Sequence, residues 1–529
     1  MPNNTMKPGD ELDLGHNIET EADGQVECLG RIFENDQARR EYYLELLAEK
    51  LRDPEFRKIE GFPIGEDEDI LNLSDPPYYT ACPNPFIERF ITFYGRPYDP
   101  SEDYKREPYA ADVSEGKNDP IYNAHSYHTK VPHKAIMRYI LHYTNPGDVL
   151  LDGFCGSGMT GVAAQLCGDK LQVESLGYRV LNDGSILREI QDGGSATWVE
   201  FSTLGVRKVV LNDISPAAYS IAYTYNVPVD EVSFESDVGR IIKTLTEKCS
   251  WMYETLHNPT GEELVIAKGK VAKGLPLSKV YPDKAAQINY SIWSDVFICS
   301  ECGHDLVFWD CAVNIETAEV SDPFLCPSCN AELSKRKLNR SMVSRIDQYS
   351  GEAVVQSKQV PVLINYKLGS KRFQKKPDSV DLILLDFISN NKIESWFPGD
   401  ELMDGKETKR NVPIGITNVH HFYTTRNLAV FAEYLNLSSG SRWSKHLYGA
   451  AKDCHSYATK MIKLNVRRLL HGGGQFMGFV GGTLYVPSLH AEQSTLSSLI
   501  TKTKKVVGNY KSSEFSISNV LAQAGSLTD

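Results

Sequence analysis

The segment DGFCGSGMTG, Asp152–Gly161, combines an acid with closely spaced glycines and could carry ligand-binding chemistry. Gly156 and Gly158 have no Cβ, so their backbone can pass close to a ligand, and a helix that begins here offers free N–H groups. A second acid, Asp213, ends the apolar run VVLND, where nucleoside-binding folds place a carboxylate that accepts hydrogen bonds from ribose hydroxyls. We therefore expect a nucleoside site; the alternative is a tight strand–helix turn with solvent-exposed acids.

The spacing of these two acids departs from the usual pattern. Asp152, which could hold a cationic amino-acid group, and Asp213 are 61 residues apart, whereas the two positions are usually about 20 residues apart. A polar insertion at 169–203, in which NDG suggests a hairpin, would account for the excess if it leaves the sheet.

Two C-x-x-C pairs predict a metal site. Two such pairs give the four thiolates of a closed tetrahedral site, which suits structural zinc; a redox role is the weaker alternative because the βαβ context is absent. Neighbouring His420 and His421, beside aromatic residues, favour packing over ligation. The four predicted zinc ligands are Cys299, Cys302, Cys326 and Cys329.

The stretch SDPPYYTACPNPF, 74–86, is poor helix and poor strand because its prolines fix φ and remove N–H donors. Within it, Asp75-Pro76-Pro77-Tyr78 places an acid and an aromatic ring on a stiff backbone. Such a stretch is either a rigid surface turn or a loop that holds something flat.

The secondary-structure pattern around these residues predicts an α/β fold. Apolar spacing predicts a helix at 37–52, a short helix at 85–95 and a helix from Pro132 that Asn-Pro-Gly ends. Buried strands are predicted before Asp152 and Asp213, so strand, helix and strand begin a parallel, doubly wound sheet. Further along, we expect helices at 215–257, 424–435 and 445–474, strands around 475–489, and a third strand in the tail 515–529.

The whole-chain numbers are those of an ordinary globular protein. The 529 residues are 41% hydrophobic, with no membrane-length apolar run and no signal peptide, so we expect a cytoplasmic protein with cysteines as thiols or metal ligands. The net charge of −13 arises mainly in residues 1–70, which hold 19 acidic and 8 basic residues. Basic stretches at 334–340, 367–376 and 501–505 permit a nucleic-acid partner, although each alone is an ordinary solvated face.

The continuous segment Pro120–Ala164, PIYNAHSYHTKVPHKAIMRYILHYTNPGDVLLDGFCGSGMTGVAA, resembles the cofactor region of bacterial amino-DNA methyltransferases. With the cysteine module, the resemblance extends to the larger zinc-ribbon-containing group of adenine-specific DNA methylases. It implies a Rossmann-like sheet that binds S-adenosylmethionine. The sequence departs from the family at Gly153, where proline is usual, and at Met159, where threonine is usual.

The resemblance assigns cofactor contacts residue by residue. His128 and Lys130 would lie near the methionine end of the cofactor, although a structural histidine is an equal alternative for His128. The other residues expected to bind the cofactor are Asp152, Phe154, Gly156, Gly158 and Asp213.

The same family carries an acid-Pro-Pro-aromatic catalytic loop, which Asp75, Pro76, Pro77 and Tyr78 match. There, a carboxylate and a backbone carbonyl accept the N–H groups of an exocyclic amine, and the aromatic ring stacks on a flipped base. Aspartate favours adenine N6 over cytosine N4. A cofactor-side or substrate-side loop is the alternative, because the position fits neither usual motif order and no second Asp-Pro-Pro follows.

Together these observations predict an S-adenosylmethionine-dependent DNA methyltransferase acting on double-stranded DNA, with restriction-associated or solitary modification as the setting. An RNA base methyltransferase, or a non-catalytic or truncated subunit that needs a second polypeptide or a defence-system partner, is the alternative. The predicted domains are an acidic leader (1–70), a methyltransferase domain (71–257, with the 169–203 insertion), a zinc ribbon (290–335) and a mostly helical C-terminal region (336–529) for target recognition and the rest of the sheet.

Overall fold

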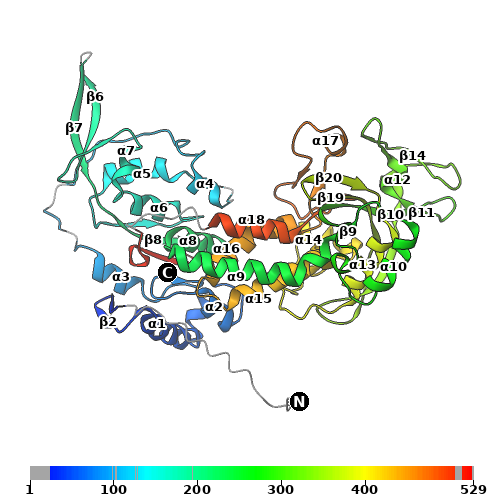
Figure 1. The fold of residues 1–529 in the computed structure, drawn as a ribbon. Coiled ribbons are helices and arrows are strands. Elements are labelled where there is room, and N and C mark those ends of the chain that lie inside the picture. The colour runs from blue at the N-terminus through cyan, green and yellow to red at the C-terminus, as the bar shows by residue number, and fades with distance from the viewer. Residues whose placement is uncertain are drawn as a thin grey trace, which may run out of the picture. The chain divides into compact units, whose positions relative to one another are not determined.

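The computed structural model describes residues 24–97, 99–101, 104–125, 127, 129–192, 195–506 and 515–526. The chain divides into two compact units, shown as a ribbon in Figure 1. Unit 1 comprises Met1–Lys117, Tyr127–Val227 and Ser512–Asp529, and unit 2 comprises Asn118–Ser126 and Pro228–Lys511.

A parallel sheet organises unit 1. Among the described residues its order is β3 (Tyr79–Thr80), β24 (Val520–Ala524), β8 (Lys208–Asp213) and β4 (Val149–Asp152). The register aligns Asp152 with Leu211, Leu211 with Ala522 and Ala522 with Tyr79. The predicted strands before Asp152 and Asp213 are confirmed, and so is the strand in the tail. β24 is fully buried and lies between β8 and β3. The first and the last segment of unit 1 therefore contribute strands to one sheet.

Helices follow the parallel strands, as the sequence predicts. α6 (Met159–Leu166) comes after β4, and α8 (Pro216–Asn226) comes after β8 and is capped by the Ser215 side chain. α5 (His133–Tyr143), which precedes β4, packs against α6, and α6 packs against α8.

The insertion between the first two strands leaves the sheet, which confirms the prediction for 169–203. After α7 (Lys170–Glu174) it forms a separate antiparallel sheet of β5 (Arg179–Val180), β6 (Ser185–Asp192) and β7 (Ser195–Thr203). β6 and β7 form the long hairpin that projects from unit 1 in Figure 1.

The N-terminal part of unit 1 begins with the two short paired strands β1 (Val26–Cys28) and β2 (Arg31–Phe33). The predicted helices at 37–52 and 85–95 are confirmed as α1 (Asp36–Leu51) and α3 (Ile87–Tyr94). The other helical elements here are η1 (Phe56–Lys58) and α2 (Asp67–Leu73).

A large antiparallel sheet organises unit 2. Its long central strand is β10 (Ala285–Ile298), which pairs with β19 (Gln359–Leu368) on one side and β23 (Leu489–Gln493) on the other. The strands that complete this sheet are β9 (Glu254–Leu256), β11 (Asp305–Val307), β16 (Asn339–Arg340), β20 (Lys371–Lys375), β21 (Lys463–Leu464) and β22 (Met477–Gly478).

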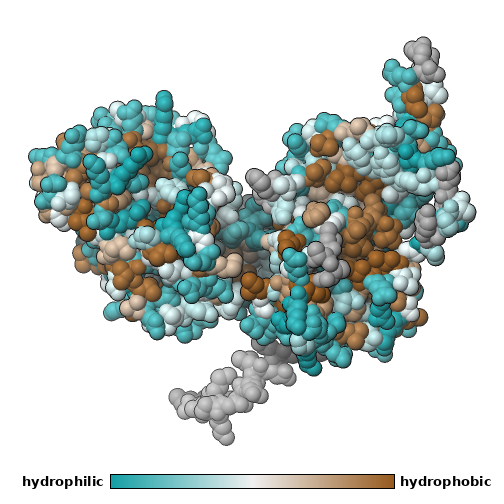
Figure 2. Space-filling model, turned by 180° about the vertical axis from the view of Figure 1, so that it is seen from behind, coloured by the Kyte–Doolittle hydropathy of each residue, from teal (hydrophilic) through white to brown (hydrophobic). Residues whose placement is uncertain are grey.

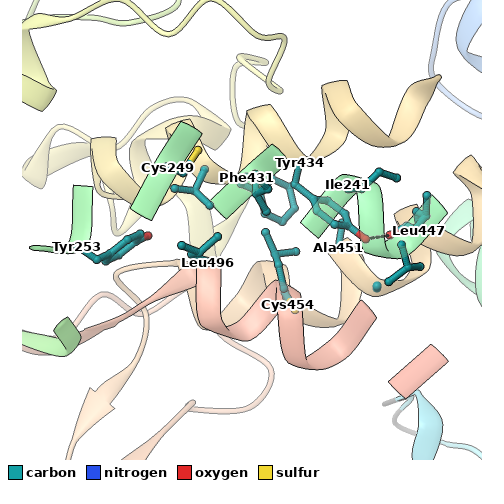
Figure 3. Packing of buried hydrophobic residues seen from close by; sticks show 14 of the residues in the cluster. Ile241, Cys249, Tyr253, Phe431, Tyr434, Leu447, Ala451, Cys454 and Leu496 are labelled. Carbon is teal, nitrogen blue, oxygen red and sulfur yellow. Dashed lines mark hydrogen bonds between the residues drawn. The ribbon is translucent and has the colours of Figure 1, made fainter. Parts of the chain in front are cut away.

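Four helices pack on this sheet around one hydrophobic cluster: α9 (Glu231–Cys249), α15 (Thr425–Ser439), α16 (Ser444–His455) and α18 (Thr495–Val506). Figure 3 shows Phe431, Tyr434 and Cys454 among the side chains of this core. The hydroxyl of the buried Tyr434 donates a hydrogen bond to the Leu447 carbonyl at 3.1 Å, so its polar end is satisfied.

The remaining elements of unit 2 are short, apart from two helices, α10 and α13, that have more than ten residues. They are α4 (Pro120–Ala124), η2 (Ser250–Tyr253), α10 (Gly261–Val271), α11 (Leu277–Val280), α12 (Phe308–Ala312), β12 (Val313–Asn314), β13 (Glu319–Val320), β14 (Phe324–Leu325), β15 (Glu332–Leu333), η3 (Lys335–Lys337), β17 (Met342–Ile346), β18 (Ala353–Ser357), α13 (Ser379–Asn390), α14 (Lys406–Lys409), η4 (Val412–Ile414), η5 (Val419–Phe422), η6 (Ser456–Ala458) and α17 (Val466–His471); η7 (Ile517–Asn519) lies in unit 1.

Several sequence predictions for unit 2 are wrong. The region 336–529 contains both strands and helices and is not mostly helical. The segment 339–375, with its alternating pattern, forms strands β16 to β20. The predicted helix at 445–474 is interrupted by β21, and of the strands predicted at 475–489 only β22 and the start of β23 form. At 215–257 the helical pattern ends in β9. Short apolar runs do not distinguish helix from strand until a partner strand is present.

Candidate functional site

The glycine turn after β4 is held by the acid that ends β8. Gly156 has a φ of 51°, and its N–H donates to Asp213 Oδ2 at 2.9 Å. The other carboxylate oxygen, Oδ1, accepts the Ser215 N–H at 2.9 Å. A carboxylate has about four lone-pair positions, so Asp213 retains acceptor capacity after these two bonds. Asp213 therefore shapes the turn and can still bind hydroxyl groups.

Gly158 is required by packing. It has a φ of 73°, and a Cβ at this position would lie 2.6 Å from Ala222 Cβ on α8. Asn226, also on α8, donates from Nδ2 to the Gly158 carbonyl at 3.1 Å. The glycine thus lets α8 approach the start of α6.

Asp152 is tied to the helix that follows it. Its Oδ2 accepts the Thr160 hydroxyl at 2.5 Å, and its Oδ1 accepts the Phe154 N–H at 3.2 Å. Ser157, within the same turn, is 2% exposed, and its hydroxyl has no hydrogen-bond partner among the described residues. An unpaired buried hydroxyl is costly unless a ligand or water satisfies it.

An aromatic ring that the sequence reasoning missed covers this turn. A Cβ on Gly156 would lie 2.9 Å from Tyr127 Cε1, so the tyrosine ring rests on the glycine. Burial, followed by the nearby Asp213 and Cys155, raises the pKa of Tyr127. Lys130 donates to the Tyr225 hydroxyl at 3.4 Å, and His128 lies outside the described residues.

The edge of the sheet beside the turn exposes apolar side chains. β4 pairs with β8, and no other described strand pairs with it. Leu151 is 71% exposed, and Phe154 and Ile214 are 86% and 63% exposed. The face of unit 1 seen in Figure 2 carries a broad patch of hydrophobic side chains. Parallel sheets usually have both faces covered by helices, so the exposure of Leu151 on β4 is unusual.

The Asp75 carboxylate lies in a different environment. Asp75 is 6% exposed; its Oδ1 is 3.0 Å from Arg39 Nη2, and its Oδ2 accepts the Tyr223 hydroxyl at 3.2 Å. Burial alone would lower the pKa of the Arg39 guanidinium, but Asp75 and then Asp36 raise it above its ordinary value. Arg39 also donates to the Pro76 carbonyl at 2.7 Å.

The aromatic residue of this loop is enclosed as well. Tyr78 is 1% exposed, and its ring lies against Phe90, with centroids 6.4 Å apart. Burial, followed by Cys28 and Tyr94, raises the pKa of Tyr78 far above its ordinary value. In this arrangement the ring is part of the core of unit 1.

A chain of hydrogen bonds joins the two loops. Asn84 Nδ2 donates to the Pro77 carbonyl at 2.9 Å, and its backbone N–H donates to Gln523 Oε1 at 2.7 Å. Gln523 Nε2 donates to Asn212 Oδ1 at 2.6 Å, and Asn212 Nδ2 donates to the Gly153 carbonyl at 3.1 Å. The structure therefore brings the two predicted loops into one polar network. The sequence analysis did not single out its three side chains, although Asn84 lies in the stretch 74–86 and Asn212 lies next to Asp213.

The cysteine module brings its four sulfurs together in unit 2. Cys299 Sγ lies 3.8 Å from Cys329 Sγ, and Cys302 Sγ lies 3.8 Å from Cys326 Sγ. All four sulfurs are within 4.8 Å of one another. A tetrahedral ion with Zn–S bonds of about 2.3 Å has S–S edges of about 3.8 Å. Two of the S–S distances thus match the edge of a tetrahedral four-thiolate metal site, and the four sulfurs together suit such a site.

Comparison with known proteins gives one match, in the N-terminal half of the chain. A family model described as DNA methylase matches residues 66–193. The match includes the Asp75 loop, Lys130 and the glycine turn, but neither Asp213 nor the four clustered cysteines of unit 2. Searches of the curated proteins and of the solved structures found no match. Within the described residues, no helix is long and apolar enough to span a membrane. Over its glycine-turn region, the chain resembles the amino-DNA methyltransferases.

Proposed function

We propose that this chain is an S-adenosylmethionine-dependent DNA methyltransferase that modifies an exocyclic amine, adenine N6 in preference to cytosine N4. The observation that carries the proposal is the glycine turn, held by the Asp213 carboxylate between two parallel strands in a segment that resembles DNA methylases. Ligands of such sheets bind outside the carboxyl ends of the strands, where this turn lies.

The residues present suit the cofactor. Asp213 would bind ribose hydroxyls with its spare acceptor positions, and Asp152 and Lys130 would flank the charged amino-acid end. Gly156, with the Tyr127 ring over it, would line the nucleoside, and Phe154 offers an exposed apolar ring. His128 is proposed for the same end as Lys130. When bound, the cofactor supplies an electrophilic methyl group.

The proposed catalytic residues are Asp75, Pro76, Pro77 and Tyr78, because they match the family loop and are linked to the glycine turn by hydrogen bonds. The role requires the Asp75 carboxylate to exchange the Arg39 guanidinium and the Tyr223 hydroxyl for the N–H groups of the target base. If these contacts are instead retained during turnover, the loop supports the site without touching the substrate.

The Asp75→Asn variant separates these two roles. A carboxylate that accepts the amine N–H groups should lose about 10–100-fold in rate when neutralised, since a hydrogen bond to a charged group is worth about 1.5–3 kcal/mol. Tyr219→Phe is the matched control, because it removes a hydrogen bond to the Leu73 carbonyl in the same layer and leaves the hydrogen bonds of Asp75 in place. Methyl transfer that falls only with the folded fraction in both variants would remove the catalytic assignment.

A second candidate function is favoured by the open edge of β4. The exposed Leu151 and Phe154 beside an unpaired parallel edge suit a further strand from a second polypeptide. In that case the chain would bind the cofactor and DNA as a subunit, and the partner would complete the site. Its signature is tight cofactor binding with no turnover until the partner is added.

Zinc is proposed as a structural ion of the four cysteines, and the basic residues that follow them are proposed to contact phosphates. Of the stretch 334–340, Arg336 and Lys337 are exposed, whereas Arg340 pairs with Asp295. A closed four-thiolate site leaves no position for catalysis, so Cys302→Ser should lower stability and DNA binding while leaving cofactor affinity unchanged.

The deciding experiment uses the purified, zinc-loaded chain. Calorimetry with S-adenosylmethionine tests the cofactor site, and transfer of labelled methyl to unmethylated duplex DNA, single-stranded DNA and RNA tests the substrate. Cofactor binding together with methyl transfer to DNA supports the proposal. Methyl transfer to RNA alone would replace it with the hypothesis of an RNA base methyltransferase. Absence of cofactor binding by the folded chain would overturn it.

A further inference from the structure

A buried carboxylate in unit 2 contacts two adjacent imidazoles. Asp347, in the loop between β17 and β18, places Oδ2 2.7 Å from His420 Nε2 and 2.6 Å from His421 Nε2. The aspartate is 7% exposed and each histidine is 5% exposed. Both histidines lie in η5, 73 and 74 residues beyond the aspartate.

The carboxylate is oriented by its own loop. Its other oxygen, Oδ1, accepts the N–H groups of Tyr349 and Ser350 at 2.9 and 2.8 Å. Oδ2 is therefore held toward the imidazoles, as the outer hydrogen bonds of metal-binding carboxylates hold their ligating oxygen. Burial would raise the pKa of Asp347, but the Ser350 N–H and the two imidazoles hold it well below its usual range.

Within the described parts of the chain, the His420 ring has no second polar contact. Its Nδ1 is buried without a hydrogen-bond partner among the described residues, and its ring contacts the rings of Tyr349 and Phe397, with centroid distances of 5.9 and 5.6 Å. Asp347 is thus the one polar group that fixes this ring in the described chain.

The cluster also faces open space. Asp347, His420 and His421 line a cavity of about 90 Å³, whose wall includes Lys460 and Arg345. A metal held by three protein groups beside such a cavity keeps coordination positions for water or another ligand.

We propose that Asp347 Oδ2 and the Nε2 atoms of His420 and His421 bind a divalent transition-metal ion, a site separate from the four cysteines. Two imidazoles and a carboxylate suit Zn²⁺, Fe²⁺, Co²⁺ or Ni²⁺ rather than Ca²⁺ or Mg²⁺. The three atoms already lie within 4.8 Å of one another. Tetrahedral ligands about 2.1 Å from an ion are about 3.4 Å apart, so each close contact needs to open by less than about 1 Å.

Metal binding must displace the protons of the two Nε2 atoms. His421 Nδ1 accepts the N–H groups of Thr417 and Asn418 at 3.3 and 3.4 Å, so without metal its proton is on Nε2 and donated to Asp347. With metal each imidazole carries its proton on Nδ1. In His421 this Nδ1–H gives up the Thr417 and Asn418 N–H bonds and faces Thr417 Oγ1, 3.5 Å away, which keeps lone pairs for it. In His420 the proton lies on the buried Nδ1 that has no partner among the described residues. The affinity for the metal should therefore fall as the pH falls, because protons then compete with the metal ion for the imidazole nitrogens.

The neighbouring cations indicate what completes the coordination. Lys460 and Arg345 would repel a metal ion, and an anionic ligand on the cavity side offsets that repulsion. Hydroxide or a phosphate oxygen meets this requirement, whereas a neutral fourth ligand would leave three positive charges together.

The test is metal stoichiometry on the full chain. After chelation and reloading with zinc, elemental analysis should find two equivalents, one for each cluster. Asp347→Asn, which keeps an acceptor for Tyr349 and Ser350, should lose one equivalent, and so should Cys302→Ser; the double variant should lose both. His490→Gln is the matched control, because it removes another buried histidine of unit 2 that lies outside the cluster.

A measurement on the wild type avoids any folding defect of the variants. When a single equivalent of zinc fills the cysteines and leaves the Asp347 cluster open, added Co²⁺ should give a visible spectrum of nitrogen and oxygen ligation without a thiolate charge-transfer band. This spectrum should disappear at low pH and be absent in His420→Gln. A single zinc equivalent in the wild type, with no Co²⁺ spectrum after zinc loading, would overturn the proposal and leave the cluster a hydrogen-bonded triad.

Discussion

The glycine turn and the Asp75 loop carry equally recognisable motifs, but the structure uses their acids in opposite ways. Asp213 accepts two backbone N–H groups at the carboxyl edge of the sheet and retains acceptor positions. Asp75 is buried, and side chains from α1 and α8 occupy both of its oxygens. A motif specifies the local backbone; whether its polar groups are available depends on residues distant in the chain.

The difference is electrostatic. Arg39 is 1% exposed and needs a buried anion, which Asp75 supplies. Removal of either charge takes away the close buried partner of the other: Arg39 would keep the half-exposed Asp36, and Asp75 would keep Arg40 at 4.0 Å. Breaking a buried ion pair in this way is strongly destabilising. Asp213, half-buried at the sheet edge, has no such obligate partner.

Removal of Arg39 should therefore have the largest effect. Arg39→Met leaves Asp75 buried without its cation and should lower the free energy of unfolding by about 3–5 kcal/mol. Chemical denaturation followed by circular dichroism measures this loss. The double variant Arg39→Met/Asp75→Leu should recover much of it, since an apolar pair of similar volume replaces the ion pair.

Arg40→Met is the matched control for this prediction. Arg40 lies 4.0 Å from the same carboxylate oxygen but its side chain is 28% exposed, so its removal should cost under about 1 kcal/mol. Similar losses in the two single variants would show that the burial of Arg39 does not set its importance.

In the glycine turn, a substitution that adds side-chain volume is expected to lower stability, because the turn is closely packed. Gly158→Ala would force a Cβ to within 2.6 Å of Ala222 Cβ and would strain a φ of 73°, so we expect a loss of about 2–4 kcal/mol together with weaker cofactor binding. Gly177→Ala, at a φ of 85° with no atom within 4 Å of the added Cβ, should cost about 1 kcal/mol. Equal losses would indicate that φ, and not the contact with α8, requires glycine at position 158.

The sequence could predict the elements whose signals are local. The strands ending at Asp152 and Asp213, the excursion at 169–203 and α5 follow from apolar runs, turn residues and caps within short windows. The convergence of the four cysteines follows from spacing, because each C-x-x-C pair folds on itself.

The remaining features depend on contacts between distant segments. Nothing near Val520 indicates that β24 enters the sheet between β8 and β3, and nothing near Asp75 indicates Arg39. Asp347 likewise meets His420 across 73 residues, so adjacent histidines that suggested packing lie in a carboxylate cluster. In unit 2, pairing with β10 decides that the residues of β19 form a strand.

The smallest expected effect is the most specific for the glycine turn. Asp213→Asn keeps the size of the side chain and an acceptor for the Gly156 N–H, but it loses the acceptor for the Ser215 N–H and removes the charge. The fold should persist, and affinity for S-adenosylmethionine should fall about tenfold, or about 1.4 kcal/mol. Asp183→Asn is the control, because Asp183 makes the same kind of bond to the Ser185 N–H in an exposed turn. Calorimetry of both variants measures the affinity, and denaturation checks stability. An unchanged affinity in Asp213→Asn would mean that this carboxylate shapes the turn and does not contact the cofactor.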